Sequence, residues 1–171
     1  MRILTVLCLS FGLFAAEPEY RSKAVLKIPQ GYRDWVFVGA NLGIGYTPGS
    51  SDDSKLFKNI YIPRKAFDSF KANGKFPDKT MLVMEVYKPE TQAEPAKTGS
   101  FEGKFLGIEV AVKDARAVDE VWAYYNFMGD NGRQLTEAKA FPKNACHDCH
   151  AKHGSVDNTF VQFYPRLRDK N

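Results

Sequence analysis

Thr80-Met81-Leu82-Val83-Met84-Glu85-Val86-Tyr87 is rich in Met, Leu and Val, stops shortly before Pro89, and predicts a β-strand. Residues 105–112 alternate around branched apolar side chains and predict a second strand. Residues 59–62 are followed by Pro63 and predict a third strand. Several strands in succession favour an antiparallel sheet.

The segments around these strands predict one helix and one loop. Apolar residues at helical spacing begin at Ala66 and stop at Asn73-Gly74, which predicts a short helix. Residues 34–38 predict a short strand or the end of a helix. Gly39 is then expected to open a long loop that includes the glycines at positions 43, 45 and 49.

A β-hairpin is predicted closer to the C-terminus. Residues 121–127 are aromatic and branched, and Gly129-Asp130-Asn131-Gly132 supplies the residues that a hairpin turn needs. With one helix early and one late, the pattern predicts an α+β fold that is predominantly antiparallel β-sheet with a few helices. The 171 residues show no internal repeat, which favours a single domain.

Residues 1–16 have the layout of a secretory signal. Arg2 precedes an apolar run from Ile3 to Phe14, and Ala15-Ala16 precede a polar segment. This run is shorter than the roughly 20 residues that cross a bilayer. We predict a signal peptide over 1–16, a single domain over 17–171, and an exported or periplasmic protein without a membrane contact after signal removal. A buried first helix or strand is the alternative.

The charge balance excludes one class of partner. The sequence has 24 Lys and Arg against 20 Asp and Glu, a formal net charge of +4. This excess is too small to indicate a nucleic-acid partner.

Cys146-His147-Asp148-Cys149-His150 is a C-x-x-C-H motif, the pattern of covalent haem attachment. Two thiols three residues apart share one face of a helix, where each can form a thioether with a haem vinyl group. His150 then points at the iron. We therefore predict a haem-binding helix near the C-terminus, one haem c per chain, and His150 as the iron ligand. The alternatives are a redox dithiol, a zinc site that recruits His147 and His153, or a chance pattern; unless they bind zinc, these two histidines are expected on an exposed surface.

The sixth iron position separates the candidate functions. A strong second ligand favours electron transfer, whereas an open or apolar side permits the binding of small molecules. No methionine follows His150, so a thioether ligand would come from Met81, Met84 or Met128. Methionine in a strand is also a flexible filler of hydrophobic cores.

Several segments together resemble the cytochrome P-460 family, which includes the cytochromes c′-beta. They are Tyr32–Gly39, Tyr61–Pro63, Gly74–Thr80, and Cys146–His150 followed by Gln162–Pro165. The resemblance covers most of the chain after the predicted signal. It implies a homodimer of mostly β subunits, a five-coordinate haem with a proximal histidine, and the handling of hydroxylamine or nitric oxide.

The resemblance also assigns positions around the haem. Enzymatic members carry a lysine cross-linked to the porphyrin, and that position falls where this chain has Met84. Lys79 and Lys88 are the nearest alternatives; a shift of one residue exchanges sheet faces, whereas Lys88 keeps the face. Members without the cross-link resemble gas-binding cytochromes whose distal pocket is capped by phenylalanine, and Phe57 is the candidate here, with an ordinary core position as the alternative.

Three functions follow as hypotheses. The first is a cytochrome that binds nitric oxide or a related small nitrogen species, which an aromatic cap without hydrogen-bond donors would favour over oxygen. The second is an oxidoreductase that oxidises hydroxylamine. The third is a small electron-transfer cytochrome with a redox partner protein.

Overall fold

The computed structural model describes residues 16–45, 55–91, 93–95, 97–116, 121–130 and 132–169. The predicted signal peptide, apart from Ala16, lies outside these residues, as do Gly49 of the predicted loop and Asn131 of the predicted turn. No helix within the described ranges is long and apolar enough to cross a membrane.

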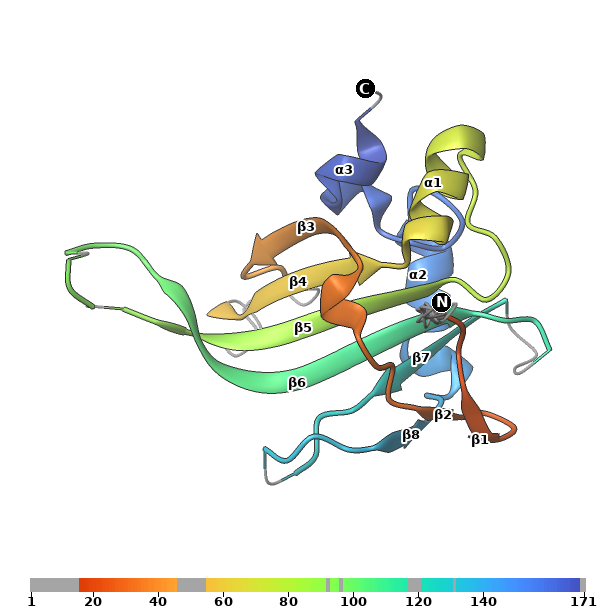
Figure 1. Ribbon diagram of the computed structural model, residues 1–171, viewed down its shortest axis with the longest axis horizontal. Coiled ribbons are helices and arrows are strands. Elements are labelled where there is room, and N and C mark those ends of the chain that lie inside the picture. Colours follow the sequence, from red (N-terminus) through yellow and green to blue (C-terminus); the bar gives the residue numbers. More distant parts are fainter. Residues whose placement is uncertain are drawn as a thin grey trace, which may run out of the picture.

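Two antiparallel sheets form the body of the protein (Figure 1). The larger has the strand order β3-β4-β5-β6-β7, with bounds Val36–Leu42, Phe57–Ile62, Met81–Glu90, Phe101–Lys113 and Trp122–Asn126. The smaller has the order β1-β2-β8, with bounds Tyr20–Ser22, Val25–Lys27 and Glu137–Lys139. The helices are α1 (Arg64–Asn73), α2 (His147–His153) and α3 (Pro165–Arg168), with 3-10 turns η1 (Tyr32–Asp34), η3 (Lys143–Ala145) and η4 (Val161–Phe163). The predicted α+β class is confirmed.

The five-stranded sheet has two buried faces, and neighbouring residues of β5 alternate between them. Met81 and Val83 pack in a core that includes residues of the smaller sheet, such as Leu26 and Ala138. Leu82 and Met84 pack in a second core with side chains of α1 and α3. We refer to the first surface as the Glu85 face and to the second as the Met84 face.

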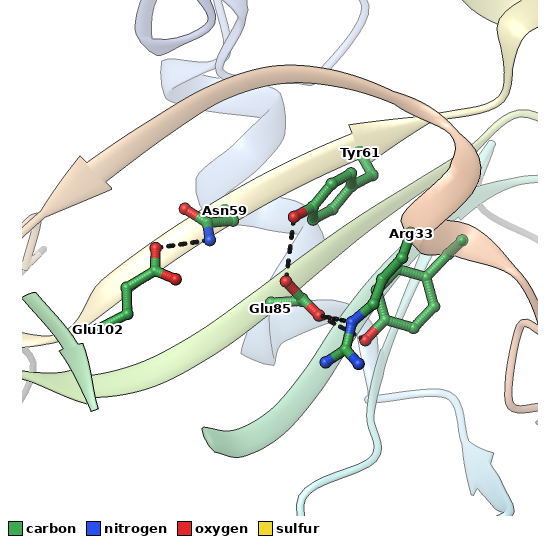
Figure 2. A network of polar contacts seen from close by, with 6 residues as sticks. Arg33, Asn59, Tyr61, Glu85 and Glu102 are labelled. Atoms are coloured by element: carbon green, nitrogen blue, oxygen red, sulfur yellow. Dashed lines mark hydrogen bonds and ion pairs between the residues drawn. The ribbon is translucent and has the colours of Figure 1, made fainter. Parts of the chain in front are cut away.

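The Glu85 face contains a closed polar network (Figure 2). Glu85 is only 2% exposed. Its carboxylate accepts hydrogen bonds from Tyr32 Oη at 2.7 Å, Arg33 Nε at 2.6 Å and Tyr61 Oη at 3.1 Å. A carboxylate can be buried when charge and hydrogen bonds compensate it, and these three donors do so. The network ties η1 and β4 to β5.

Most of the predicted elements are confirmed: the strands become β4, β5, β6 and β7, and the helix becomes α1. Gly74 ends α1 with a positive φ of 68°. β5 runs through Pro89 instead of stopping before it. Proline is tolerated there because β4 pairs with β5 only as far as Tyr87, so the rest of β5 is the outer part of a two-stranded hairpin.

Two predictions need correction. Gly39 lies inside β3 and does not open the loop. A Cβ atom on Gly39 would lie 2.9 Å from Pro165 Cδ, so the glycine instead permits close approach of the C-terminal segment. The hairpin after β7 forms in part: Met128 bridges Gln134, but the strand that follows, β8, pairs with β2 and not with β7.

Candidate functional site

The C-x-x-C-H motif lies at the start of α2. Cys146 precedes the first residue of the helix, and Cys149 lies in its first turn. Both thiols are free; Cys146 is half-buried and Cys149 is exposed. Burial raises the pKa of the Cys146 thiol, and the negative charge of Glu109 on β6 adds to the effect. Because neither thiol is in a disulfide, both can react with a group that binds at this end of α2.

His150 is fixed in place by contacts on several sides. Its ring lies between those of Tyr124, with centroids 4.4 Å apart, and Phe160, with centroids 4.3 Å apart. Its Nδ1 lies 3.1 Å from the carbonyl oxygen of Asn158. Because a carbonyl can only accept, Nδ1 carries the proton in this contact, and Nε2 of the neutral ring keeps its lone pair. A fixed ring position and a fixed tautomer are what a metal-ligating histidine requires, so His150 would be able to hold an iron through Nε2.

The protonation of His150 also suits ligation. Burial lowers the pKa of its imidazole, and the hydrogen bond to Asn158 opposes that shift in part. Since burial is the larger cause, the neutral ring is favoured, and only the neutral ring can bind a metal ion.

The carbonyl that meets His150 belongs to a tight turn, Val156–Thr159. Asp157 and Asn158 have successive φ angles of 48° and 56°, the pattern of a type I′ turn. The turn closes by a hydrogen bond from Thr159 N to Val156 O at 2.9 Å. Tyr124 Oη also donates to the Asn158 carbonyl, at 3.3 Å.

Strand register places this assembly on the Met84 face. Tyr124 pairs with Ala111, and Ala111 pairs with Leu82, so the three side chains share a face of the sheet. Met84, two residues after Leu82, lies on that face and is partly buried. The predicted residues Cys146, Cys149 and His150 are thus held next to the sheet face that carries Met84, with α2 behind the sheet in Figure 1.

The structure does not bring Phe57 to this side. Phe57 alternates with Lys58 along β4 and shares a face with Asn59 and Tyr61, which are on the Glu85 side in Figure 2. Met81 also lies on the Glu85 face and is 2% exposed. Met128 packs against Gly107, whose added Cβ would lie 2.6 Å from Met128 Cγ.

The alternative lysines lie apart from the motif. Lys79 precedes β5, and its Nζ forms an ion pair with Glu17 at 2.5 Å. Lys88 is exposed, in the part of β5 that extends beyond β4.

The other two histidines differ from each other. His153 is exposed, as predicted. His147 is not: its side chain is only 15% exposed. Among the described residues, no group of three His, Cys, Asp or Glu side chains is placed to hold a metal ion, and this disfavours the zinc alternative.

Three residues of the site were not singled out from the sequence: Tyr124, Asn158 and Phe160. The Asp157-Asn158 pair carries a usable signal, because Asp and Asn are among the residues that most readily adopt positive φ. No comparable signal marks Tyr124 and Phe160, whose role depends on packing against His150.

The donor set fits a covalently bound haem. Two free thiols flank one helical turn, and a neutral imidazole with a fixed tautomer follows directly. Aromatic rings surround that imidazole, as suits a large apolar macrocycle.

Comparison with known proteins agrees with this geometry. The sequence model of the family Cytochrome P460 matches residues 29–161 of the 171-residue chain. The matched range runs from the segment before η1 to the first residue of η4 and includes the whole C-x-x-C-H motif. A comparison with curated proteins finds no match. Since the match spans most of the chain, this protein belongs to the cytochrome P460 family and is a haem cytochrome.

Proposed function

We propose that the protein is an exported monohaem c-type cytochrome whose haem, attached to Cys146 and Cys149 and ligated by His150, binds nitric oxide or a related small nitrogen species. The observation that carries the proposal is the setting of His150. Its Nδ1 proton is held by a carbonyl, and its ring is held between two aromatic side chains, so that Nε2 is presented as a single axial donor.

The chain supplies few candidates for a second strong ligand. All three of its histidines lie between positions 147 and 153, in α2, so none can reach the opposite side of a haem held there. Of the two methionines in β5, Met84 is on the Met84 face and Met81 is turned away. Met84 is therefore the methionine of β5 that faces the motif, and we propose that it packs without ligating the iron, so that bound haem would be five-coordinate and would supply an iron that takes a small ligand.

Met84 separates ligand binding from hydroxylamine oxidation. A thioether has no nucleophilic nitrogen that could cross-link to a porphyrin, and the neighbouring Lys79 is paired with Glu17. Family membership alone supports the second candidate, an oxidoreductase that acts on hydroxylamine. We rank it second for that reason, and a small electron-transfer cytochrome third.

Absorption spectra of the haem-loaded protein, ferric and ferrous, test the proposal when recorded before and after anaerobic addition of nitric oxide. We expect a high-spin ferrous spectrum that changes on addition of nitric oxide. A ferrous Soret band moved far to the red would instead support a cross-linked macrocycle and the enzyme. A low-spin ferrous haem that does not respond to nitric oxide would overturn ligand binding.

Variants of the two C-terminal histidines of α2 provide a matched control. His150→Ala is expected to abolish the native ferrous spectrum, because it removes the axial donor. His153→Ala, on the same helix but exposed, is expected to leave the spectrum unchanged. Cys146→Ser with Cys149→Ser should remove the haem mass from the denatured chain, since no thioether can then form.

Two further expectations belong to this proposal. Export predicts that the amino terminus of protein isolated from the periplasm lies near Glu17, which N-terminal sequencing would show. A homodimer, which the family resemblance implies, would be measured by sedimentation equilibrium.

A further inference from the structure

We propose that the ion pair between Lys113 and Asp157 is a positioning device for the axial histidine, which sets the strength of the bond from His150 to the iron. The inference rests on the proposed axial role of His150. It assigns a function to two residues that touch neither the haem-attachment motif nor the imidazole ring.

One backbone carbonyl controls the hydrogen bonding of the His150 ring. Asn158 O is the hydrogen-bond partner of His150 Nδ1, at 3.1 Å. A firm hydrogen bond from Nδ1–H increases electron density on the ring and makes Nε2 a stronger donor, and a loose one does the reverse. Whatever fixes this carbonyl therefore controls the axial bond.

The Asn158 carbonyl lies in a turn whose backbone conformation is unfavourable. Asp157 and Asn158 both have positive φ, which L-residues adopt at a cost, even though Asp and Asn tolerate it best. Val156 O accepts hydrogen bonds from Thr159 N at 2.9 Å and Thr159 Oγ1 at 2.7 Å, whereas the bond from Val156 N to Thr159 O is long at 3.5 Å; none of the three is made by Asp157 or Asn158. The turn thus benefits from an external anchor.

Lys113 is this anchor. Its Nζ lies 2.6 Å from Asp157 Oδ2 and 2.8 Å from the carbonyl oxygen of Phe76. The Lys113 and Asp157 side chains are 18% and 22% exposed, whereas pairs such as Arg33–Glu85 and Lys79–Glu17 each have one side chain that is more than half exposed. Lys113 is the last residue of β6, and its amide donates to Thr80 O at 2.8 Å. The turn is thereby tied to the sheet.

Two variants test the inference because they remove opposite charges. Asp157→Asn keeps a residue that tolerates positive φ but loses the ion pair. Lys113→Met keeps most of the side-chain length and loses the ion pair from the other side. If the pair positions the carbonyl, both variants loosen the His150 hydrogen bond, shift the iron–histidine stretching band of the ferrous protein to lower frequency, and raise the reduction potential.

A simple charge effect makes a different prediction for one of these variants. Loss of a nearby positive charge favours the ferric state, so Lys113→Met would lower the potential, while Asp157→Asn would raise it. The sign of the Lys113→Met shift therefore decides between the two explanations. The double variant should equal either single variant if the residues act as a pair.

Controls separate positioning from general damage. Lys113→Arg can keep the pair with Asp157 and is expected to restore the wild-type band and potential. Arg21→Met, which breaks an ion pair with Glu137 in the smaller sheet, should change neither. Haem content and circular dichroism identify any variant that does not fold, in which case Lys113→Gln replaces Lys113→Met.

The outcomes distinguish this inference from the proposed function. Wild-type band and potential in both single variants, or a lowered potential in Lys113→Met, would overturn the positioning role while leaving His150 as the ligand. Absence of any iron–histidine band in the wild type would contradict the five-coordinate haem; the potentials of the variants would still test the anchor.

Discussion

Glu85 and Met84 are adjacent in β5, but their side chains lie on opposite faces of the sheet, and the two faces differ in what stabilises them. On the Glu85 face, a carboxylate that is 2% exposed receives three donors from within the chain, and the network is complete (Figure 2). On the Met84 face, Ile60 and Leu82 beside Met84 are apolar, Glu109 of β6 lies directly opposite Met84, and the thiols and the imidazole come from the C-terminal motif. The Glu85 face is stabilised by contacts within the chain, whereas the Met84 face lies next to the residues that would hold the haem.

The largest expected effect is on the Glu85 face. Glu85→Ala would leave two tyrosine hydroxyls without their acceptor, while Arg33 is 62% exposed and stays hydrated, and we expect a loss of about 2–5 kcal/mol in the free energy of unfolding. Urea denaturation measures it. The ferrous spectrum should stay unchanged, because this residue lies on the other face from His150.

Glu137→Ala is the matched control for that loss. Glu137 also pairs with an arginine, Arg21, but its side chain is 38% exposed, so its removal should cost about 1 kcal/mol or less. Equal losses in the two variants would mean that the burial of Glu85 does not matter, and the contrast between the faces would fail.

The next effect concerns the way the C-terminal segment packs on β3, beside the Met84 face. Gly39→Ala would place a Cβ atom 2.9 Å from Pro165 Cδ and 3.3 Å from Phe163 O. Such overpacking is expected to cost about 1–3 kcal/mol, measured as a lower urea midpoint. Ala40→Ser, at an exposed position of the same strand, should be close to neutral. Wild-type stability in Gly39→Ala would show that the segment moves away at little cost.

A smaller effect is expected at Met84 itself. Met84→Leu keeps an apolar side chain of similar volume, so we expect a loss of less than about 1.5 kcal/mol. The ferrous spectrum should remain that of a high-spin haem. A low-spin wild-type spectrum that becomes high-spin in Met84→Leu would show that Met84 ligates the iron, and would favour the electron-transfer function.

The smallest expected effect is a change in stability at Tyr61, on the Glu85 face. Burial, followed by the charge of Glu85, raises the pKa of Tyr61 to about 12. The neutral hydroxyl therefore contributes to stability fully below the ordinary tyrosine pKa of about 10, and this contribution disappears as the pH rises towards 12. Tyr61→Phe should cost about 1 kcal/mol at neutral pH.

The pH dependence sharpens that prediction. The difference in melting temperature between wild type and Tyr61→Phe should be constant up to about pH 10 and shrink between pH 10 and 12. A constant difference across this range would show that the Tyr61 hydroxyl does not titrate as the network requires.

Much of the fold could be predicted because it depends on local patterns. The apolar runs of β4, β5 and β6 and the helical spacing of α1 appear in the sequence at the positions where the structure has them. The three-residue strands β1, β2 and β8 could not be predicted, because their sequences are too short to show a period and the pairing of β2 with β8 joins segments more than a hundred residues apart. Gly39 suggested a loop for the same reason: its contact with Pro165 is not visible locally.

The haem site divides in the same way. Cys146, Cys149 and His150 are recognisable from sequence because thioether attachment and axial ligation require residues at set spacing on one helical turn. The partners of His150 are not recognisable, because a backbone carbonyl carries no residue identity and the rings of Tyr124 and Phe160 are joined to it by packing alone. The family resemblance suggested positions near the haem for both Phe57 and Met84, but strand register places them on opposite faces of the sheet. The spacing of residues in the sequence therefore identifies the attachment cysteines and the ligand. The surroundings of His150 depend on the pairing of distant strands and on the contact of the turn at 156–159 with α2, which only the tertiary structure decides.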